Sequence, residues 1–464
     1  MCEAAKDRLS IENIRFIATV PKKNGAKGVS ILPILVRDLK ALEKGVLMFC
    51  EKDKQCVLVI APVLWIGADT PCHSEICGLS GPTSLYPCRK CYVCIHRLKD
   101  SLPDKEYCTD PHKRRTRKHY VLANSMSDRT TIIPDAPTDG CNLSVEDLSF
   151  QDRSTGSLLE LDAFDPSSGT PVEVIHTILL GIGKYMVIHL MNGILKSKKD
   201  IIQRLKTCLD GYKCSTGLSR KFTRNINHSG SYVGRDFKVL LQILPVILVT
   251  DFSNEPILDR IKPCFVELGR LCSLVFVREV TSGFDDYLVE VDLSVRRLLG
   301  QLHNYDTFKR AEVKENNKTA KIKKKYTAFC TKRKIHNLTH LKYDIRRFGT
   351  ALQFETEKGE QFNKHIREHL FHTNHKNTSR DVCLKLAKQA ALQYVMDGGS
   401  WLNENGQRER PGCGIAAFLQ GKSEKKFRFS FFGGSRDFTS NNDTGDRDEE
   451  RIKNNSFGAF IFYQ

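Results

Sequence analysis

Apolar and polar residues alternate over the first hundred positions in patterns typical of strands and one helix. Residues 13–20 (NIRFIATV) and 45–50 are rich in the β-branched, aromatic and aliphatic residues that strands favour. Between them, residues 29–45 carry apolar side chains at helical spacing and stop at a glycine. The ten-residue run Val57–Ile66 has one proline and no charge. It is too short to span a membrane, so it predicts a buried strand, and this order of elements predicts an α/β sheet.

The pattern changes to helical spacing over about 130 residues in the middle of the chain. From Pro171 to about Asn304, apolar residues recur every three to four positions, as in PVEVIHTILLGIGKYMVIHLMNGIL. We therefore expect a helical subdomain inserted into the α/β frame. After Trp401 the chain is polar and rich in Gly and Asn, which is typical of a poorly ordered tail.

Charge adds a preference for polyanionic partners. The 464 residues hold 72 Lys and Arg against 54 Asp and Glu, a net charge of +18. Such an excess favours nucleic acid as a partner. An anionic membrane is the competing partner, but no basic amphipathic anchor stands out in the sequence. Residues 309–334 alone hold eleven Lys or Arg and two Glu. Such a run is usually a solvated, mobile segment, but it can also neutralise phosphates.

The 17 cysteines are expected to be reduced. The N-terminus, MCEAAKDRLS, lacks the apolar core of a secretory signal, so we expect an intracellular setting. In that setting cysteines are more often reduced thiols or metal ligands than partners in disulfides. Cys88 and Cys91 have the CxxC spacing that tetrahedral zinc uses, and Cys94 offers an overlapping choice. Two further ligands are needed, and Cys72 with Cys77 is one option. The alternative is a pair of unligated buried thiols.

A second option for the remaining ligands lies far downstream. His336 and His340 in HNLTH are four residues apart, which places both imidazoles on one face of a helix. The alternative is a pair of ordinary surface histidines. The spacing alone leaves the choice between the cysteine and histidine pairs open.

Two acidic positions are candidates for chemistry. Asp69 follows the predicted Val57–Ile66 strand, and Glu357 opens a late helix with Glu360 on the same face. Asp69 can also be explained as a turn residue in Asp-Thr-Pro. If the carboxylates converged, they could hold divalent ions such as Mg²⁺ or Mn²⁺ for phosphodiester cleavage.

Several of these motifs together resemble a known family. IRFIATV, ADTPCHSEICGLSG, PCRKCYV, PVEVIHTILLGIGKYM, GRDFKVLLQILPVIL and HNLTHLKYDIRRFG followed by TEKGEQFNKHIR occur in an order and spacing similar to fungal DDE transposase-like proteins. The resemblance, to the CACTA (En/Spm)-like and Kyakuja–Dileera–Zisupton-like elements, runs from about residue 13 to residue 401.

The resemblance implies a fold, a site and a zinc ligand set. It implies an α/β, RNase H-like catalytic core interrupted by a large all-helical insertion. It implies that Asp69 is the second catalytic acid and Glu357 the third, with Glu360 as the alternative to Glu357, and that Mg²⁺ or Mn²⁺ is the catalytic metal. It also favours a structural zinc ion bound by Cys88 and Cys91 together with His336 and His340. His176 matches a family histidine, for which core packing is the simpler explanation. DNA is the implied partner, the nucleus the implied compartment, and a homo-oligomer a further expectation.

The resemblance also implies a division of the chain and a missing acid. The family's first catalytic Asp lies upstream of the segment that matches here, so the chain is expected to be N-terminally truncated and catalytically incomplete. Two functions follow: a transposase-derived protein whose ancestor cleaved and transferred DNA strands, or a non-catalytic, zinc-containing nucleic-acid-binding protein.

The expected segments are the first core part with the CxxC loop (1–110), a basic, loop-rich connector (111–170), the helical insertion (171–308), a basic linker (309–335), the second core part (336–400) and the tail (401–464).

Overall fold

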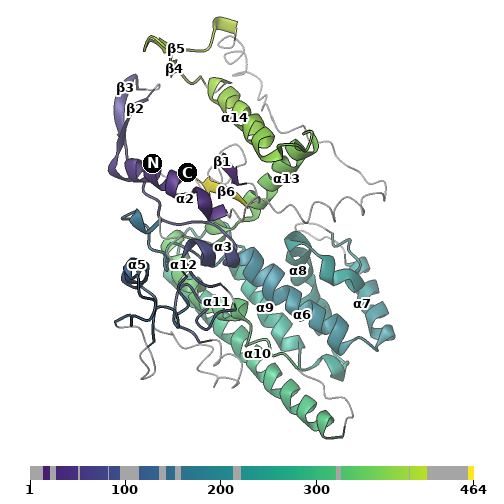
Figure 1. The fold of residues 1–464 in the computed structure, drawn as a ribbon. Helices are drawn as coiled ribbons and strands as arrows, with labels where there is room; N and C mark the ends of the chain where they lie inside the picture. The colour runs from purple at the N-terminus through teal and green to yellow at the C-terminus, as the bar shows by residue number, and fades with distance from the viewer. Residues whose placement is uncertain are drawn as a thin grey trace. The chain divides into compact units, whose positions relative to one another are not determined.

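The computed structural model describes residues 14–20, 28–50, 53–81, 83–94, 114–134, 143–151, 158–212, 221–319, 326–396, 398–414 and 458–463 (Figure 1). The chain divides into two compact units. The first unit comprises Met1–Val63, Glu160–Ala163 and Glu357–Gln464. The second comprises Leu64–Leu159 and Phe164–Thr356.

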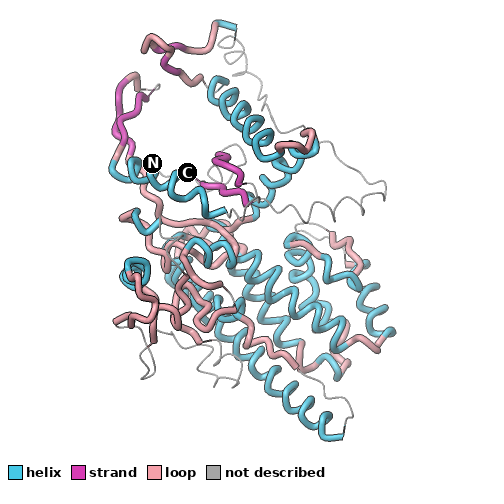
Figure 2. The backbone as a smooth tube through the Cα atoms, in the orientation of Figure 1, coloured by secondary structure: helices cyan, strands magenta, loops and turns pink. Residues whose placement is uncertain are grey.

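Helices supply nearly all the regular structure of the second unit (Figure 2). In chain order they are α3 (Thr70–Ile76), α5 (Arg117–Ser125), η5 (Ile175–Gly183), α6 (Lys184–His189), η6 (Leu190–Ile194), α7 (Lys199–Gly211), η7 (Ile226–Ser231), α8 (Gly234–Thr250), η8 (Pro256–Leu258), α9 (Lys262–Val275), α10 (Phe284–Thr319), α11 (Arg333–Asn337), η9 (Leu338–His340), α12 (Leu341–Phe348) and η10 (Ala351–Phe354). The helical spacing read between residues 171 and 304 is therefore confirmed in the residues described.

The centre of this unit is the continuous helical run Ile175–Ile194. By length and composition alone it could cross a membrane, a test that buried core helices of soluble proteins also pass. More than half of it is buried, and it packs against α8 and α11. Because α9 packs on both α8 and α10, and α12 packs on α10, one apolar core runs from Val174 to Phe354. The segment with the HNLTH motif is thus part of the helical core.

The basic run at 309–334 is in part helical. Helix α10 continues to Thr319, past the expected boundary at residue 308, with the ion pairs Lys309–Glu312 and Lys318–Glu315 along it. Ion pairs at this spacing support a helix, which is why the high charge does not end it. Residues 320–325 lie outside the described part of the chain. The chain then returns to the core at Phe329 and Cys330, whose backbone N–H groups donate to the buried Asp306 on α10 at 2.9 and 2.8 Å.

In its described residues, the first unit combines short strands with helical segments. Its elements are β1 (Ile14–Val20), η3 (Gly28–Ile31), α2 (Leu32–Lys44), β2 (Val46–Cys50), β3 (Gln55–Val59), α13 (Glu357–Phe371), α14 (Thr378–Met396), β4 (Trp401–Leu402), β5 (Arg408–Glu409) and β6 (Gly458–Tyr463). The strands pair antiparallel as β1–β6, β2–β3 and β4–β5. A small core of Phe362, Ile366, Val382 and Leu386 joins α13 to α14.

The predicted buried strand at Val57–Ile66 is wrong beyond Val59, and the part that does form a strand is not buried, since Leu58 is 58% exposed. Strand β3 ends at Val59, and residues 60–69 follow an irregular path to α3. Pro62 has no N–H to donate to a strand ladder, so it disfavours continuation. Ile66 instead donates its N–H to the carbonyl of Gly169 at 2.8 Å. Within the described residues the sheets are all two-stranded, and the RNase H-like core stays a prediction.

Candidate metal centre

Two segments of the second unit bring four potential metal ligands together. Cys88 and Cys91 lie on the loop that follows α3, and His336 and His340 lie on the helical turn from α11 into η9. All four side chains are buried, and their ligand atoms lie within 4.8 Å of one another. The spacing of four residues puts both imidazoles on one side of the helical turn, as the sequence predicted.

The distances between the ligand atoms suit a tetrahedral ion. Sγ of Cys88 lies 3.4 Å from Nε2 of His340, and Sγ of Cys91 lies 3.2 Å from Nε2 of His336. The two Nε2 atoms are 3.3 Å apart. Zinc bonds of about 2.3 Å to sulfur and about 2.05 Å to nitrogen give tetrahedral edges of about 3.5 Å (S···N) and about 3.3 Å (N···N). The cluster therefore has the size of a zinc site with two Cys and two His ligands.

The surroundings favour the metal-binding protonation state at Cys88 and His340 but not at Cys91, whose pKa is raised well above its ordinary value by burial and by the neighbouring Cys88. Burial alone would raise the pKa of the Cys88 thiol, but a hydrogen bond from Cys91 and the neighbouring His340 hold that pKa well below its ordinary value. Burial lowers the pKa of His340. A thiolate and a neutral imidazole are the forms that bind metal.

Backbone and side-chain contacts fix the loop that carries the cysteines. The backbone N–H of Lys90 donates to Sγ of Cys88 at 3.4 Å, and Nε of the fully buried Arg115 donates to the Cys88 carbonyl at 2.9 Å. Arg89, also buried, donates from Nε and Nη2 to the carbonyls of Thr170 and Pro171 at 3.1 and 2.9 Å. Such contacts would hold the two cysteines in place for a metal ion.

A buried ion pair also joins the two ligand segments. Lys90, between the two cysteines, donates from Nζ to Oδ1 of Asp344 at 2.7 Å. Asp344 lies four residues beyond His340, and its Oδ2 accepts from the backbone N–H of Val172 at 2.8 Å. Both charged side chains are less than one-tenth exposed. The segments that would share the ion are thus held together by a second contact.

The other cysteines considered from the sequence lie outside the cluster. Among the residues that the structure describes, Cys72, Cys77 and Cys94 are not part of a metal-ligating group. Burial raises the pKa of both Cys72 and Cys77 to about 12, so both are neutral thiols. The geometry thus selects the histidine pair over the Cys72 and Cys77 option.

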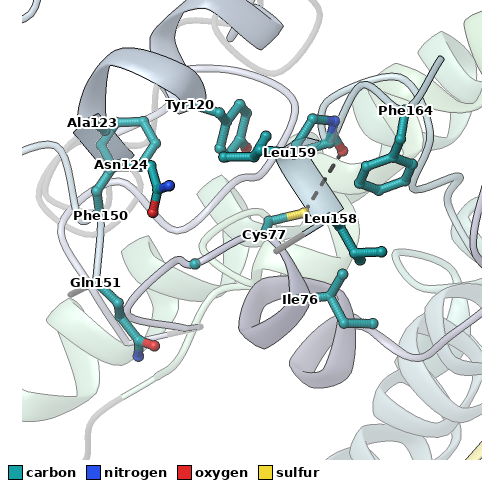
Figure 3. A pocket seen from close by; sticks show the side chains of 12 residues that line it. Ile76, Cys77, Tyr120, Ala123, Asn124, Phe150, Gln151, Leu158, Leu159 and Phe164 are labelled. Atoms are coloured by element: carbon teal, nitrogen blue, oxygen red, sulfur yellow. Dashed lines mark hydrogen bonds between the residues drawn. The ribbon is translucent and has the colours of Figure 1, made fainter. Parts of the chain in front are cut away.

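Cys77 borders a cavity that is too small for a substrate. Figure 3 shows the Cys77 thiol, at the end of α3, directed at a backbone carbonyl. That carbonyl belongs to Pro166, and its oxygen lies 3.7 Å from Sγ of Cys77. Tyr120 and Asn124 of α5 lie on the cavity wall. The cavity holds about 20 Å³, which is enough for one water molecule.

The predicted catalytic acids lie in different units. Asp69 is the N-cap of α3, where its Oδ1 accepts from the backbone N–H of Cys72 at 2.9 Å. This agrees with the turn interpretation and fixes the carboxylate at a helix start. Glu357 opens α13 of the first unit, with Glu360 on the same helix. A pairing of Asp69 with Glu357 stays a prediction.

His176, which matches a family histidine, is partly buried. Its Nδ1 lies 2.8 Å from Oε2 of Glu173, which is a structural contact.

The sequence did not reveal that part of the basic stretch 112–119 is structural. Arg115 is buried against the rings of Tyr92 and Phe150, and Arg117 donates to the carbonyls of Leu159 and Phe164. His112 and Lys113 lie outside the described residues. Arginine can be buried because its flat, weakly hydrated head is satisfied by carbonyls and aromatic faces, a property that a charge count does not register.

Comparisons of the chain with protein-family models, with curated proteins and with solved structures found no match.

Proposed function

We propose that the cluster of Cys88, Cys91, His336 and His340 holds a structural zinc ion. All four positions of a tetrahedral ion are supplied by the protein, and all four side chains are buried. A catalytic zinc site would keep a position open for water or substrate, whereas this one is closed. The ion would cross-link residues 245 and 252 positions apart in the sequence.

On this scaffold we propose a transposase-derived protein that binds nucleic acid. The observation that carries the proposal is the cluster itself, because the four residues brought together are the four that the family resemblance pairs. The net charge of +18 supports a polyanionic partner. A protein with this role would act in the nucleus.

Binding to DNA is expected to weaken steeply with salt. Each phosphate neutralised by Lys or Arg releases counterions, so three or more such contacts lower the affinity for duplex DNA more than about tenfold between 50 and 200 mM salt. Fluorescence anisotropy of a labelled duplex over that salt range measures the slope. No binding, or binding that salt leaves unchanged, would favour a zinc-stabilised interaction module without a nucleic-acid role.

A second candidate function is metal-dependent cleavage of DNA strands. The observation that favours it is Asp69, whose carboxylate is held in place at the start of α3. If the chain cleaves DNA with Mg²⁺ or Mn²⁺, Asp69→Asn is expected to abolish the activity and leave the melting temperature nearly unchanged, because Asn is an equally good N-cap but a poor ligand for hard cations. Asp210→Asn, an exposed change on α7, is the matched control. Cleavage that survives Asp69→Asn would rule out this role.

A further inference from the structure

A pocket of about 280 Å³ adjoins the proposed zinc site in the second unit. Its lining includes His340, one of the four metal ligands, and Asp344. The remaining residues are all hydrogen-bond donors or cationic: Lys90, Arg114, Ser167, Ser168, Tyr343, Arg346 and Arg347. Its volume is close to that of small-ligand sites, in contrast to the one-water cavity beside Cys77.

The charge of the pocket is positive after internal pairing is counted. Asp344, the one acid in the described lining, is paired with Lys90. Arg114, Arg346 and Arg347 remain. Arg346 contacts Asp285 of α10 at 2.8 Å, but both side chains are more than half exposed, and an exposed pair contributes little. The pocket is therefore built to receive an anion.

The arrangement of Arg114 suits a phosphate. Its guanidinium lies 3.6 Å from the ring centroid of Tyr343. A guanidinium stacked on an aromatic ring keeps its N–H donors free at the edge, where they can bind two phosphate oxygens at once. Arg346 and Arg347 are exposed on α12 beside Tyr343, and each adds donors of the same kind.

Apart from Ser167 and Ser168, the lining forms two walls, and each belongs to one of the two proposed metal-ligating segments or is paired with it. Lys90 lies between Cys88 and Cys91, and Arg114 is joined to Cys91 by an antiparallel backbone bridge. Helix α12, which carries Tyr343, begins directly after His340. An ion shared by these segments would fix one wall relative to the other.

We propose that this pocket binds a backbone phosphate of a nucleic acid, and that it needs an occupied metal site to do so. The inference rests on the proposed function. It assigns to this pocket a phosphate contact that the net charge alone does not locate.

The test compares two double variants that remove the same charge. Arg346→Gln with Arg347→Gln is expected to lower duplex affinity about tenfold near 0.1 M salt and to reduce the salt slope by about one. The control, Arg235→Gln with Arg270→Gln, changes exposed residues of α8 and α9 that do not line the pocket, and its affinity is expected to change less than about twofold. Zinc chelation should weaken the wild type and leave the pocket variant nearly unchanged, with circular dichroism confirming that the helices persist.

The outcomes separate the pocket from the wider proposal. Equal losses in the pocket and control variants, with salt-dependent binding by the wild type, would overturn the pocket assignment and leave nucleic-acid binding standing. A wild type that binds no nucleic acid would overturn both. Pyrophosphate that binds the wild type but does not compete with DNA would assign the pocket to a free phosphate compound and would contradict the inference.

Discussion

Removal of the metal is expected to destabilise the second unit by roughly 5–6 kcal/mol, the stabilisation that chain-entropy arguments give a cross-link closing a very long loop. The proposed ion joins Cys91 to His336, 245 residues away. In thermal unfolding followed by circular dichroism, the zinc-loaded wild type should melt well above the chelated protein. Cys88→Ser is expected to reproduce the chelated melting temperature, because three ligands hold zinc far more weakly than four.

A matched control separates loss of the ion from loss of a thiol. Cys94→Ser changes a cysteine six residues along that is not part of the cluster, and its melting temperature should stay close to that of the wild type. Chelation should have no further effect on Cys88→Ser. If chelation lowered the melting temperature of Cys88→Ser as much as that of the wild type, the stabilising metal would be bound elsewhere.

Asp344→Asn is expected to cost about 3–5 kcal/mol, because it leaves the buried ammonium of Lys90 without a counter-charge. Asp344 and Lys90 are 2.7 Å apart, and their side chains are 4% and 8% exposed. Because the pair also joins the two ligand segments, zinc affinity should fall by about tenfold or more, as it does when groups that support ligands are changed. Urea unfolding of the zinc-loaded protein and competition with a chromogenic chelator measure the two effects.

The double variant Lys90→Met with Asp344→Leu tests whether the unpaired buried charge causes this loss of stability. Replacing both charges by apolar side chains leaves no buried charge uncompensated, so the double variant should be more stable than Asp344→Asn. A double variant as unstable as the sum of its two single changes would show that the ion pair is not the source of the loss.

Each half of the candidate ligand set could be read from the sequence because its spacing is local. The CxxC of Cys88 and Cys91 and the four-residue step from His336 to His340 each describe one turn of chain. Joining the two halves needed the family resemblance, since spacing alone left Cys72 with Cys77 as an alternative. The structure brings the histidine pair, and not those cysteines, to Cys88 and Cys91.

Other features depended on contacts that no local pattern contains. Lys90 and Asp344 are 254 residues apart, and neither gives a sign of being buried. The apolar run after Val59 had the composition of a strand, but Pro62 removes a ladder donor within it. Helix α10 continued into a run whose charge suggested a mobile segment. The ion pair was set by a partner distant in sequence, the end of the strand by one backbone group, and the continuation of α10 by ion pairs three residues apart, which a count of charges does not register.

The metal content of purified protein tests the central claim most directly. Mass spectrometry of the metal in the wild type, in Cys88→Ser and in His340→Ala, each prepared with zinc present, compares one ligand from each segment. The account predicts about one zinc ion per chain in the wild type and almost none in either variant. About one zinc ion per chain in both variants would show that Cys88 and His340 are not ligands.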